Sequence, residues 1–178
     1  MSVELKLRDV VIPRDKIARR VREIADEITA AYKSEELVVV GVLKGSVIFV
    51  SDIVRKIGPE VDVRLDFISV SSYGDSTSPS GEVRILKDLD VSPEGHHILL
   101  VDDILDTGRT LSRLVSLINA RNPKSVRTCV LAEKPARKKT DFTPDYVGFT
   151  VPDVFIVGYG MDWAGRMRNL PDINFVSE

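Results

Sequence analysis

The chain has 178 residues, of which 43% are hydrophobic and 29% are charged, and its formal net charge is −2. These values predict a single globular domain over residues 1–178. They exclude an overall positive charge of the kind that binds nucleic acid. No apolar run is long enough to span a membrane, and we expect no secretory signal. The single cysteine, Cys129, excludes an internal disulfide and is expected to be a buried hydrophobe. We therefore expect a cytoplasmic protein that binds neither membrane nor nucleic acid.

The first part of the chain alternates between helical and strand patterns. Residues 13–32 place apolar side chains at helical spacing and predict a helix. Residues 37–43 form an unbroken apolar run, which predicts a strand buried on both faces and followed by a Lys44-Gly45-Ser46 loop. A second helix is expected over residues 47–57, and alternation over residues 61–67 predicts a half-exposed strand.

Residues 71–81 are the only low-complexity segment and consist mainly of Ser, Gly, Asp and Pro. Taken alone, this composition fits a disordered connection and an active-site lid equally well. Further strands are expected over residues 83–86, 126–131, 146–149 and 155–157, with an irregular tail after Asp162. Strands interleaved with helices predict an α/β fold with a parallel core sheet.

The most informative segment spans residues 97–111, where an apolar strand leads through acids into a small loop and a helix. The strand over residues 98–101 lacks alternation, and helical spacing resumes near Thr110. The loop between them therefore lies at the carboxyl edge of a sheet, where α/β folds bind ligands. Its small residues can present backbone N–H groups to an anion, and the neighbouring acids suit sugar hydroxyls. Together they predict a site for a sugar phosphate.

This segment resembles the phosphoribosyl pyrophosphate motif of type I phosphoribosyltransferases: a hydrophobic run, two acids, two apolar residues, then Asp-Thr/Ser-Gly-x-Thr. Residues 42–46, 71–74, 131–135 and 155–162 resemble the hypoxanthine (hypoxanthine-guanine) phosphoribosyltransferases in order and spacing, over nearly the whole chain. The resemblance implies a mainly parallel central sheet flanked by helices, with a small hood from the terminal segments. It also implies transfer of a phosphoribosyl group to hypoxanthine or guanine in purine salvage, by a homodimer or homotetramer.

The resemblance assigns phosphoribosyl pyrophosphate to several loops, with residues 71–81 as a lid and a strained peptide at Leu43-Lys44. In chain order, its binding residues would be Leu43, Lys44, Gly45, Ser72, Tyr73, Asp102, Asp103, Asp106, Thr107, Gly108, Arg109, Thr110 and Arg168. Arg109 is expected to point outward. The Mg²⁺ cofactor would be held by Asp102, Asp103 and Asp162, although the family more often has Glu at the Asp102 position.

The same resemblance makes Asp106 the general base toward the purine N7, with helix capping as its alternative role. Lys134 matches the lysine that contacts the 6-oxo group, and Phe155 matches the aromatic residue that stacks on the base. Ile156 and Asp162 complete the expected purine site. From its position alone, Phe155 is more simply interpreted as a core strand residue.

Residues 137–139 are expected to form a solvated basic turn.

Two further classes of protein remain as alternative functions: a nucleic-acid-binding regulator built on the same fold, and a phospho-receiver module. The regulator is disfavoured because the chain lacks an additional DNA-binding domain and because Asp106 and Lys134 complete a purine-converting site. The receiver is disfavoured because its acid pair should follow the first strand, whereas Asp102 lies past the middle.

Overall fold

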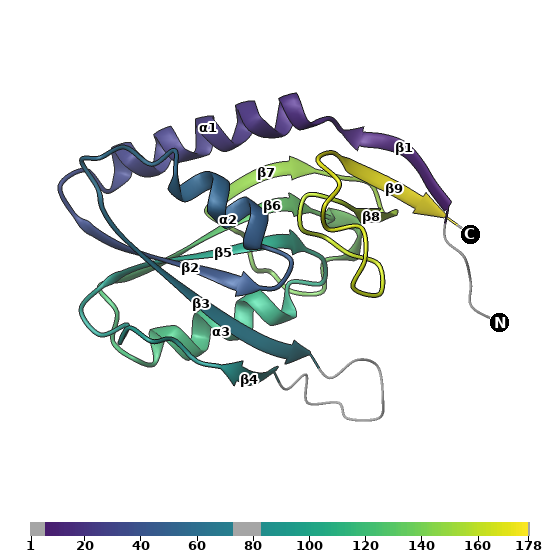
Figure 1. Ribbon diagram of the computed structural model, residues 1–178. Helices are drawn as coiled ribbons and strands as arrows, with labels where there is room; N and C mark the ends of the chain where they lie inside the picture. The colour runs from purple at the N-terminus through teal and green to yellow at the C-terminus, as the bar shows by residue number, and fades with distance from the viewer. Residues whose placement is uncertain (1–5, 73–82, 178) are drawn as a thin grey trace.

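A computed structural model describes residues 6–72 and 83–177, and a six-stranded sheet forms the body of the molecule (Figure 1). The strand order is β4-β3-β2-β5-β6-β7; only β4, at one edge, pairs antiparallel. The strands are β2 (Glu36–Leu43), β3 (Asp62–Ser72), β4 (Val83–Lys87), β5 (His97–Leu105), β6 (Ser125–Glu133) and β7 (Tyr146–Thr150). The predicted α/β fold with a mainly parallel sheet is confirmed.

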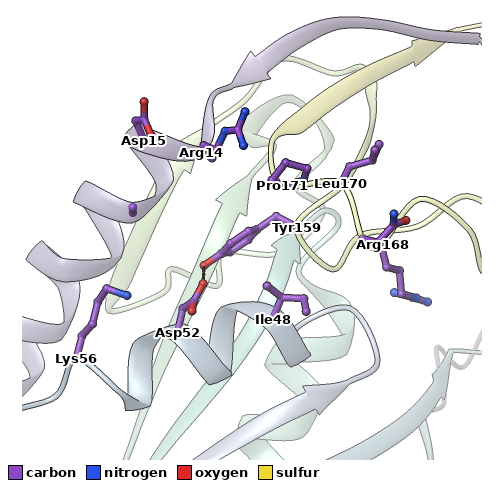
Figure 2. A pocket seen from close by; sticks show the side chains of 11 residues that line it. Arg14, Asp15, Ile48, Asp52, Lys56, Tyr159, Arg168, Leu170 and Pro171 are labelled. Carbon is purple, nitrogen blue, oxygen red and sulfur yellow. Dashed lines mark hydrogen bonds between the residues drawn. The ribbon is translucent and has the colours of Figure 1, made fainter.

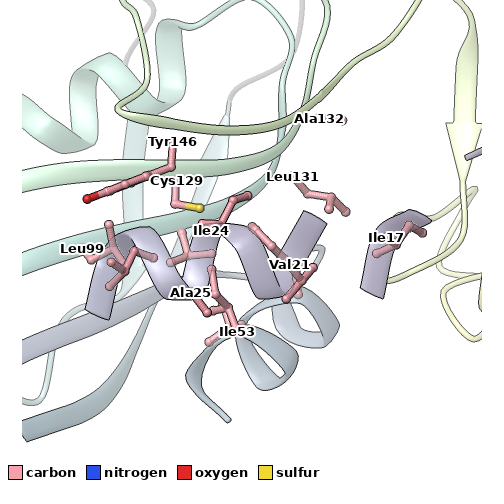
Figure 3. Close-up of a cluster of buried hydrophobic side chains, with 14 of the residues drawn as sticks. Ile17, Val21, Ile24, Ala25, Ile53, Leu99, Cys129, Leu131, Ala132 and Tyr146 are labelled. Atoms are coloured by element: carbon pink, nitrogen blue, oxygen red, sulfur yellow. The ribbon is translucent and has the colours of Figure 1, made fainter. Parts of the chain in front are cut away.

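Helices cover both faces of this sheet (Figure 1). Helices α1 (Arg14–Ala31) and α2 (Val47–Val54) pack on one face, and α3 (Arg109–Asn119) packs on the other. Figure 3 shows Ile17, Val21 and Ile24 of α1 packed among buried sheet residues that include Cys129. The thiol is fully buried, and burial raises its pKa, as expected for a cysteine that acts as a hydrophobe.

A second, antiparallel sheet has the order β1-β9-β8 and brings the two ends of the described chain together. Its strands are β1 (Lys6–Ile12), β8 (Phe155–Val157) and β9 (Ile173–Ser177). This sheet is the small hood that the family resemblance implies. The prediction of an irregular tail after Asp162 is wrong, because β9 forms between two strands that are distant in sequence. Such pairing stabilises a strand that local pattern alone does not reveal.

Several element boundaries differ from the predictions. Helix α2 ends at Val54, whereas the pattern predicts helix to residue 57. Strand β5 continues to Leu105, beyond the apolar run over residues 98–101, and includes Asp102 and Asp103. The expected lid overlaps residues 73–82, so Tyr73 and most of the lid lie outside the described residues. Among the helices described, none has the length and apolar character to cross a membrane.

Candidate active site

The carboxyl ends of β2, β5 and β6 meet at one edge of the large sheet, where open α/β folds bind ligands (Figure 1). Strand β2 ends at Leu43, β5 ends at Leu105 and β6 ends at Glu133. The expected Lys44, Asp106 and Lys134 therefore leave three adjacent strands at the same edge. Residues far apart in sequence are brought together by the parallel pairing alone.

We call residues 106–110 the phosphate loop; it joins β5 to α3. Gly108 caps α3 with φ +81°, and a Cβ there would lie 2.4 Å from Thr140 Oγ1, so this position requires glycine. The Arg109 N–H donates to Thr107 Oγ1 at 3.4 Å, and Arg109 is exposed, as expected. The helix is capped by Gly108 without a side-chain bond, so the capping alternative for Asp106 is not observed. The loop presents the N-terminus of α3 to an anion.

Residues 43–45 and 158–168 form a second group of loops, which carries several of the residues expected to bind pyrophosphate, and we call them the pyrophosphate loops. The Leu43-Lys44 peptide bond is cis, and Lys44 is exposed. A Cβ at Gly45 would lie 1.7 Å from Asp103 Oδ2, and one at Gly160 would lie 2.1 Å from the Gly45 carbonyl oxygen. Three segments therefore meet at distances that no added side chain would allow.

Asp102 and Asp103 follow one another along β5. The Asp103 N–H donates to Asp102 Oδ1 at 2.9 Å, and the Ile104 N–H donates to Asp103 Oδ1 at 2.9 Å. Although each residue keeps some exposed surface, burial raises the pKa of Asp102 well above its usual range, and the charge of Asp103 adds to this. Burial also raises the pKa of Asp103, whereas the neighbouring Arg168 opposes the shift. The pair therefore favours a bound proton or cation.

Arg168 and Asp162 pair across the second pyrophosphate loop. Arg168 Nη2 lies 2.6 Å from Asp162 Oδ1, and Arg168 Nη1 donates to the Gly160 carbonyl oxygen at 2.6 Å. Asp162 Oδ2 accepts a hydrogen bond of 2.6 Å from the Gly165 N–H. Both carboxylate oxygens of Asp162 are therefore engaged within its own loop.

A cavity of about 410 Å³ lies between this loop and helices α1 and α2, and Arg168 also lines it (Figure 2). Within it the Tyr159 hydroxyl donates to Asp52 Oδ2 at 2.6 Å. Burial raises the pKa of Tyr159, and the bond to Asp52 adds to the shift, so the phenol stays a donor. This bond ties the loop to α2. Sequence analysis gave neither residue a role, although Tyr159 lies in the segment 155–162 that carries the resemblance, because the contact joins segments distant in sequence.

Lys134 and Phe155 are the two side chains that the family resemblance assigns to the purine. Lys134 is 6% exposed, burial lowers its pKa, and its Nζ has no hydrogen-bond partner within residues 6–72 and 83–177. Phe155 is 45% exposed and meets Trp163 edge-on, with ring centroids 5.4 Å apart. Its interpretation as a core residue is therefore wrong, whereas the next residue, Ile156, is buried. An unpartnered cation and an exposed aromatic face suit a planar base that carries an acceptor.

Arg137 connects the turn that follows Lys134 with the phosphate loop. Its Nε lies 2.9 Å from Asp106 Oδ1, and its Nη1 lies 3.6 Å from Asp153 Oδ1. Arg137 and Lys139 are exposed, as predicted for a solvated turn, but the ion pairs of Arg137 were not foreseen. Sequence analysis also missed Asp153, which precedes β8. The available signal was the position of an arginine one turn after Lys134, in the 3₁₀ helix η1 (Pro135–Arg137).

The fold and these loops define a phosphoribosyltransferase, and residues 13–163 match the family described as "Phosphoribosyl transferase domain". The chain is 46% identical over 167 residues to the hypoxanthine-guanine phosphoribosyltransferase of Bacillus subtilis, covering 94% of this chain and 92% of the relative. It is also similar to the crystal structure of a hypoxanthine-guanine phosphoribosyltransferase from Bacillus anthracis, with a TM-score of 0.91, 42% identity, and coverage of 98% and 100% of the two chains. The chain belongs to the hypoxanthine-guanine phosphoribosyltransferase family.

Some relatives are much longer. The chain is 46% identical over 175 residues to the "Bifunctional protein TilS/HprT" of Listeria innocua, covering 98% of this chain and 27% of the relative. The chain thus spans about a quarter of the length of that relative. The similarity concerns one part of the longer protein.

Proposed function

We propose that this chain, as a single domain, transfers the 5-phosphoribosyl group from phosphoribosyl pyrophosphate to hypoxanthine or guanine. The products are IMP or GMP and pyrophosphate, as in purine salvage. The observation that carries the proposal is Lys134, a residue only 6% exposed whose ammonium has no hydrogen-bond partner in the described chain, at the same sheet edge as Asp106 and the phosphate loop. An ammonium on a largely buried side chain can donate to a ligand acceptor, and the 6-oxo group supplies one.

The purine would lie between Lys134 and the exposed ring of Phe155. In this proposal the Ile156 backbone carbonyl accepts the N1 proton of a 6-oxopurine, and Asp162 closes the far side of the base. Adenine would present a donor to Lys134 and would lack the N1 proton, so two polar groups would stay unpaired. Sites that rely on such contacts can reject an unmatched analogue by about 10⁴-fold. Phe155 supplies affinity for any purine without discrimination.

The phosphoribosyl half uses the loops at the other end of the edge. Thr107, Gly108 and Thr110 would hold the 5′-phosphate at the N-terminus of α3, with the Arg109 backbone as a further donor. Asp102 and Asp103 would accept the ribose hydroxyls. A purine nitrogen attacks the anomeric carbon, and the bond from this carbon to the pyrophosphate oxygen breaks. The Asp106 carboxylate accepts the N7 proton, and positioned bases of this kind contribute about 10²–10⁴-fold.

The leaving pyrophosphate carries several negative charges that the protein must neutralise. Lys44, Arg168 and the amides near Leu43 and Gly45 would bind it at the pyrophosphate loops. Ser72 ends β3 and Tyr73 follows it, so we propose that the lid begins there and excludes water while the ribose carries positive charge. The lid proposal rests on the sequence, since Tyr73 lies outside the described residues.

The acid pair fits Mg²⁺, which takes one or two carboxylates and completes its shell with phosphate oxygens and water. Two adjacent carboxyls whose pKa values are raised by burial form a site that a cation would stabilise. Asp162 contributes only if its bonds to Arg168 and Gly165 open. When bound, the ion neutralises charge that develops on the pyrophosphate. The described residues form no cluster of three metal-ligating side chains, so substrate oxygens must complete the shell.

We also propose that the chain forms a homodimer or homotetramer and works in the cytoplasm. Val47 and Ile48 on α2 are 38% and 39% exposed, which leaves apolar surface available for a second copy. The reduced, buried Cys129 fits a reducing compartment. Sedimentation velocity of the purified protein measures the oligomeric state, and a monomer at micromolar concentration would contradict this part of the proposal.

The direct test of function is an assay with hypoxanthine, phosphoribosyl pyrophosphate and MgCl₂, in which IMP and pyrophosphate are both quantified. We expect the two products in equal amounts, loss of turnover after exhaustive chelation, and recovery when Mg²⁺ is restored. Absence of IMP would contradict the proposed reaction, and full turnover after chelation would contradict the metal requirement.

A further inference from the structure

Arg137 lies on neither of the two substrate-binding loops, yet it contacts the residue assigned as general base. We propose that Arg137 is a positioning residue that holds Asp106 in place and keeps it from pairing with Lys134. This inference deepens the proposed function and rests on it, because it assigns a task to Asp106 and Lys134 that only a purine site requires.

The short turn that carries Arg137 is bonded at one end to the last residue of β5 and at the other end to the phosphate loop. The Lys134 N–H donates to the Leu105 carbonyl oxygen at 2.9 Å, and the Lys139 N–H donates to the Thr107 carbonyl oxygen at 3.0 Å. Between these two bonds, the Arg137 N–H closes the 3₁₀ turn on the Lys134 carbonyl oxygen at 3.1 Å. The backbone thus fixes the base of the arginine side chain beside Asp106.

The ion pair leaves part of the carboxylate available for the substrate. Arg137 Nε approaches Asp106 Oδ1 at 2.9 Å, and a carboxylate has a second oxygen that can accept the N7 proton. On its other side, Arg137 Nη1 lies 3.6 Å from Asp153 Oδ1. The guanidinium therefore lies between two carboxylates, and its planar group fixes their orientation better than a point charge would.

The four charges of this cluster explain why the arrangement matters. Burial lowers the pKa of Lys134, whereas the nearby Asp106 raises it, so these two groups attract one another. Without Arg137, Lys134 would still attract Asp106, and an ion pair between them would occupy both purine contacts at once. Arg137 thus keeps the general base, Asp106, apart from Lys134, the donor to the 6-oxo group. Both side chains then remain available for the purine.

The stability of the fold does not account for this arginine. Arg137 and Asp106 are 48% and 40% exposed, and an exposed ion pair contributes about 0–1 kcal/mol. A variant that lacks the guanidinium should therefore fold normally. Because folding is preserved, a change in activity can be attributed to the position of Asp106.

The experiment compares Arg137→Gln and Arg137→Lys with Lys139→Gln, which removes the same charge from an exposed neighbour in the same turn. For Arg137→Gln we expect kcat/KM for hypoxanthine to fall roughly 10- to 100-fold, the scale of a misplaced catalytic group, while KM for phosphoribosyl pyrophosphate changes less than about twofold. Arg137→Lys should recover part of the loss, and Lys139→Gln should match the wild type. An unchanged Arg137→Gln variant, or equal losses in Arg137→Gln and Lys139→Gln, would overturn the inference.

A crystal structure of the free Arg137→Gln variant separates this inference from the proposed reaction. We expect the Asp106 carboxylate to move within hydrogen-bond distance of Lys134 Nζ, whatever the activity of the protein. If Asp106 keeps its wild-type position, the inference is wrong even where the wild type forms IMP. Whether the protein catalyses the proposed reaction is decided by the wild-type assay alone.

Discussion

The phosphate loop and the pyrophosphate loops bind charged groups of the same proposed substrate, but they are built in different ways. The phosphate loop is one continuous segment between β5 and α3, and its one tight requirement is Gly108 against Thr140. The pyrophosphate loops come from two segments far apart in the sequence and meet where Gly160 contacts the Gly45 carbonyl oxygen. A continuous loop can be recognised from its own residues, whereas a site between segments depends on how the whole chain packs.

The strongest way to test the phosphate loop is Asp106→Asn. The amide keeps the size of the side chain but does not accept the N7 proton, so kcat should fall about 10²–10⁴-fold. KM for phosphoribosyl pyrophosphate should change little, because the backbone donors of residues 107–110 remain. Steady-state kinetics with both substrates varied measures the two quantities. A near-normal kcat would show that Asp106 only braces the loop.

The corresponding test of the pyrophosphate loops is Gly160→Ala. The added Cβ would lie 2.1 Å from the Gly45 carbonyl oxygen, so the two loops must separate. A loss of about 1–3 kcal/mol from such overpacking corresponds to a rise of roughly tenfold in KM for phosphoribosyl pyrophosphate for each 1.4 kcal/mol. KM for hypoxanthine should change much less.

Gly165→Ala is the matched control for this variant. Gly165 lies in the same loop with φ +82°, close to the +102° of Gly160, but a Cβ there meets no atom of the described chain within 4 Å. Both variants therefore carry similar backbone strain, and only Gly160→Ala adds the contact with Gly45. Equal KM values for the two variants would show that strain, not the approach of the two loops, controls binding.

The smallest expected effect concerns the acid pair that lies between the two regions. Burial raises the pKa of Asp102, so the ionised carboxylate destabilises the free protein as pH rises through that raised pKa. Asp102→Asn should therefore raise Tm at neutral pH, by about 2–4 °C for each kcal/mol relieved in a chain of this size. The gain should shrink as pH falls below the raised pKa, where the wild-type carboxyl is already neutral. Calorimetry at several pH values measures it, and a lower Tm at neutral pH would contradict the shift.

The sequence predictions succeeded for features of one continuous segment and failed for contacts between distant segments. The strands β2 and β5, helix α1 and the start of α3 were predicted because buried apolar runs and helical spacing are local properties. Strand β9 was missed because it depends on β1 and β8. The exposure of Phe155 contradicts the core position that its strand pattern alone favours and is compatible with the stacking role that the family resemblance implies. The ion pair between Arg137 and Asp106 and the hydrogen bond from Tyr159 to Asp52 join segments whose proximity only the fold determines.

The central claim is that Lys134 makes this a site for 6-oxopurines. The most direct measurement is kcat/KM for hypoxanthine, guanine and adenine, with wild type and Lys134→Gln under identical Mg²⁺ and phosphoribosyl pyrophosphate. We predict that the wild type prefers hypoxanthine or guanine over adenine by about 10⁴-fold, and that Lys134→Gln narrows this gap by weakening the 6-oxopurines. Comparable kcat/KM values for adenine and hypoxanthine in the wild type would contradict the assignment of the site.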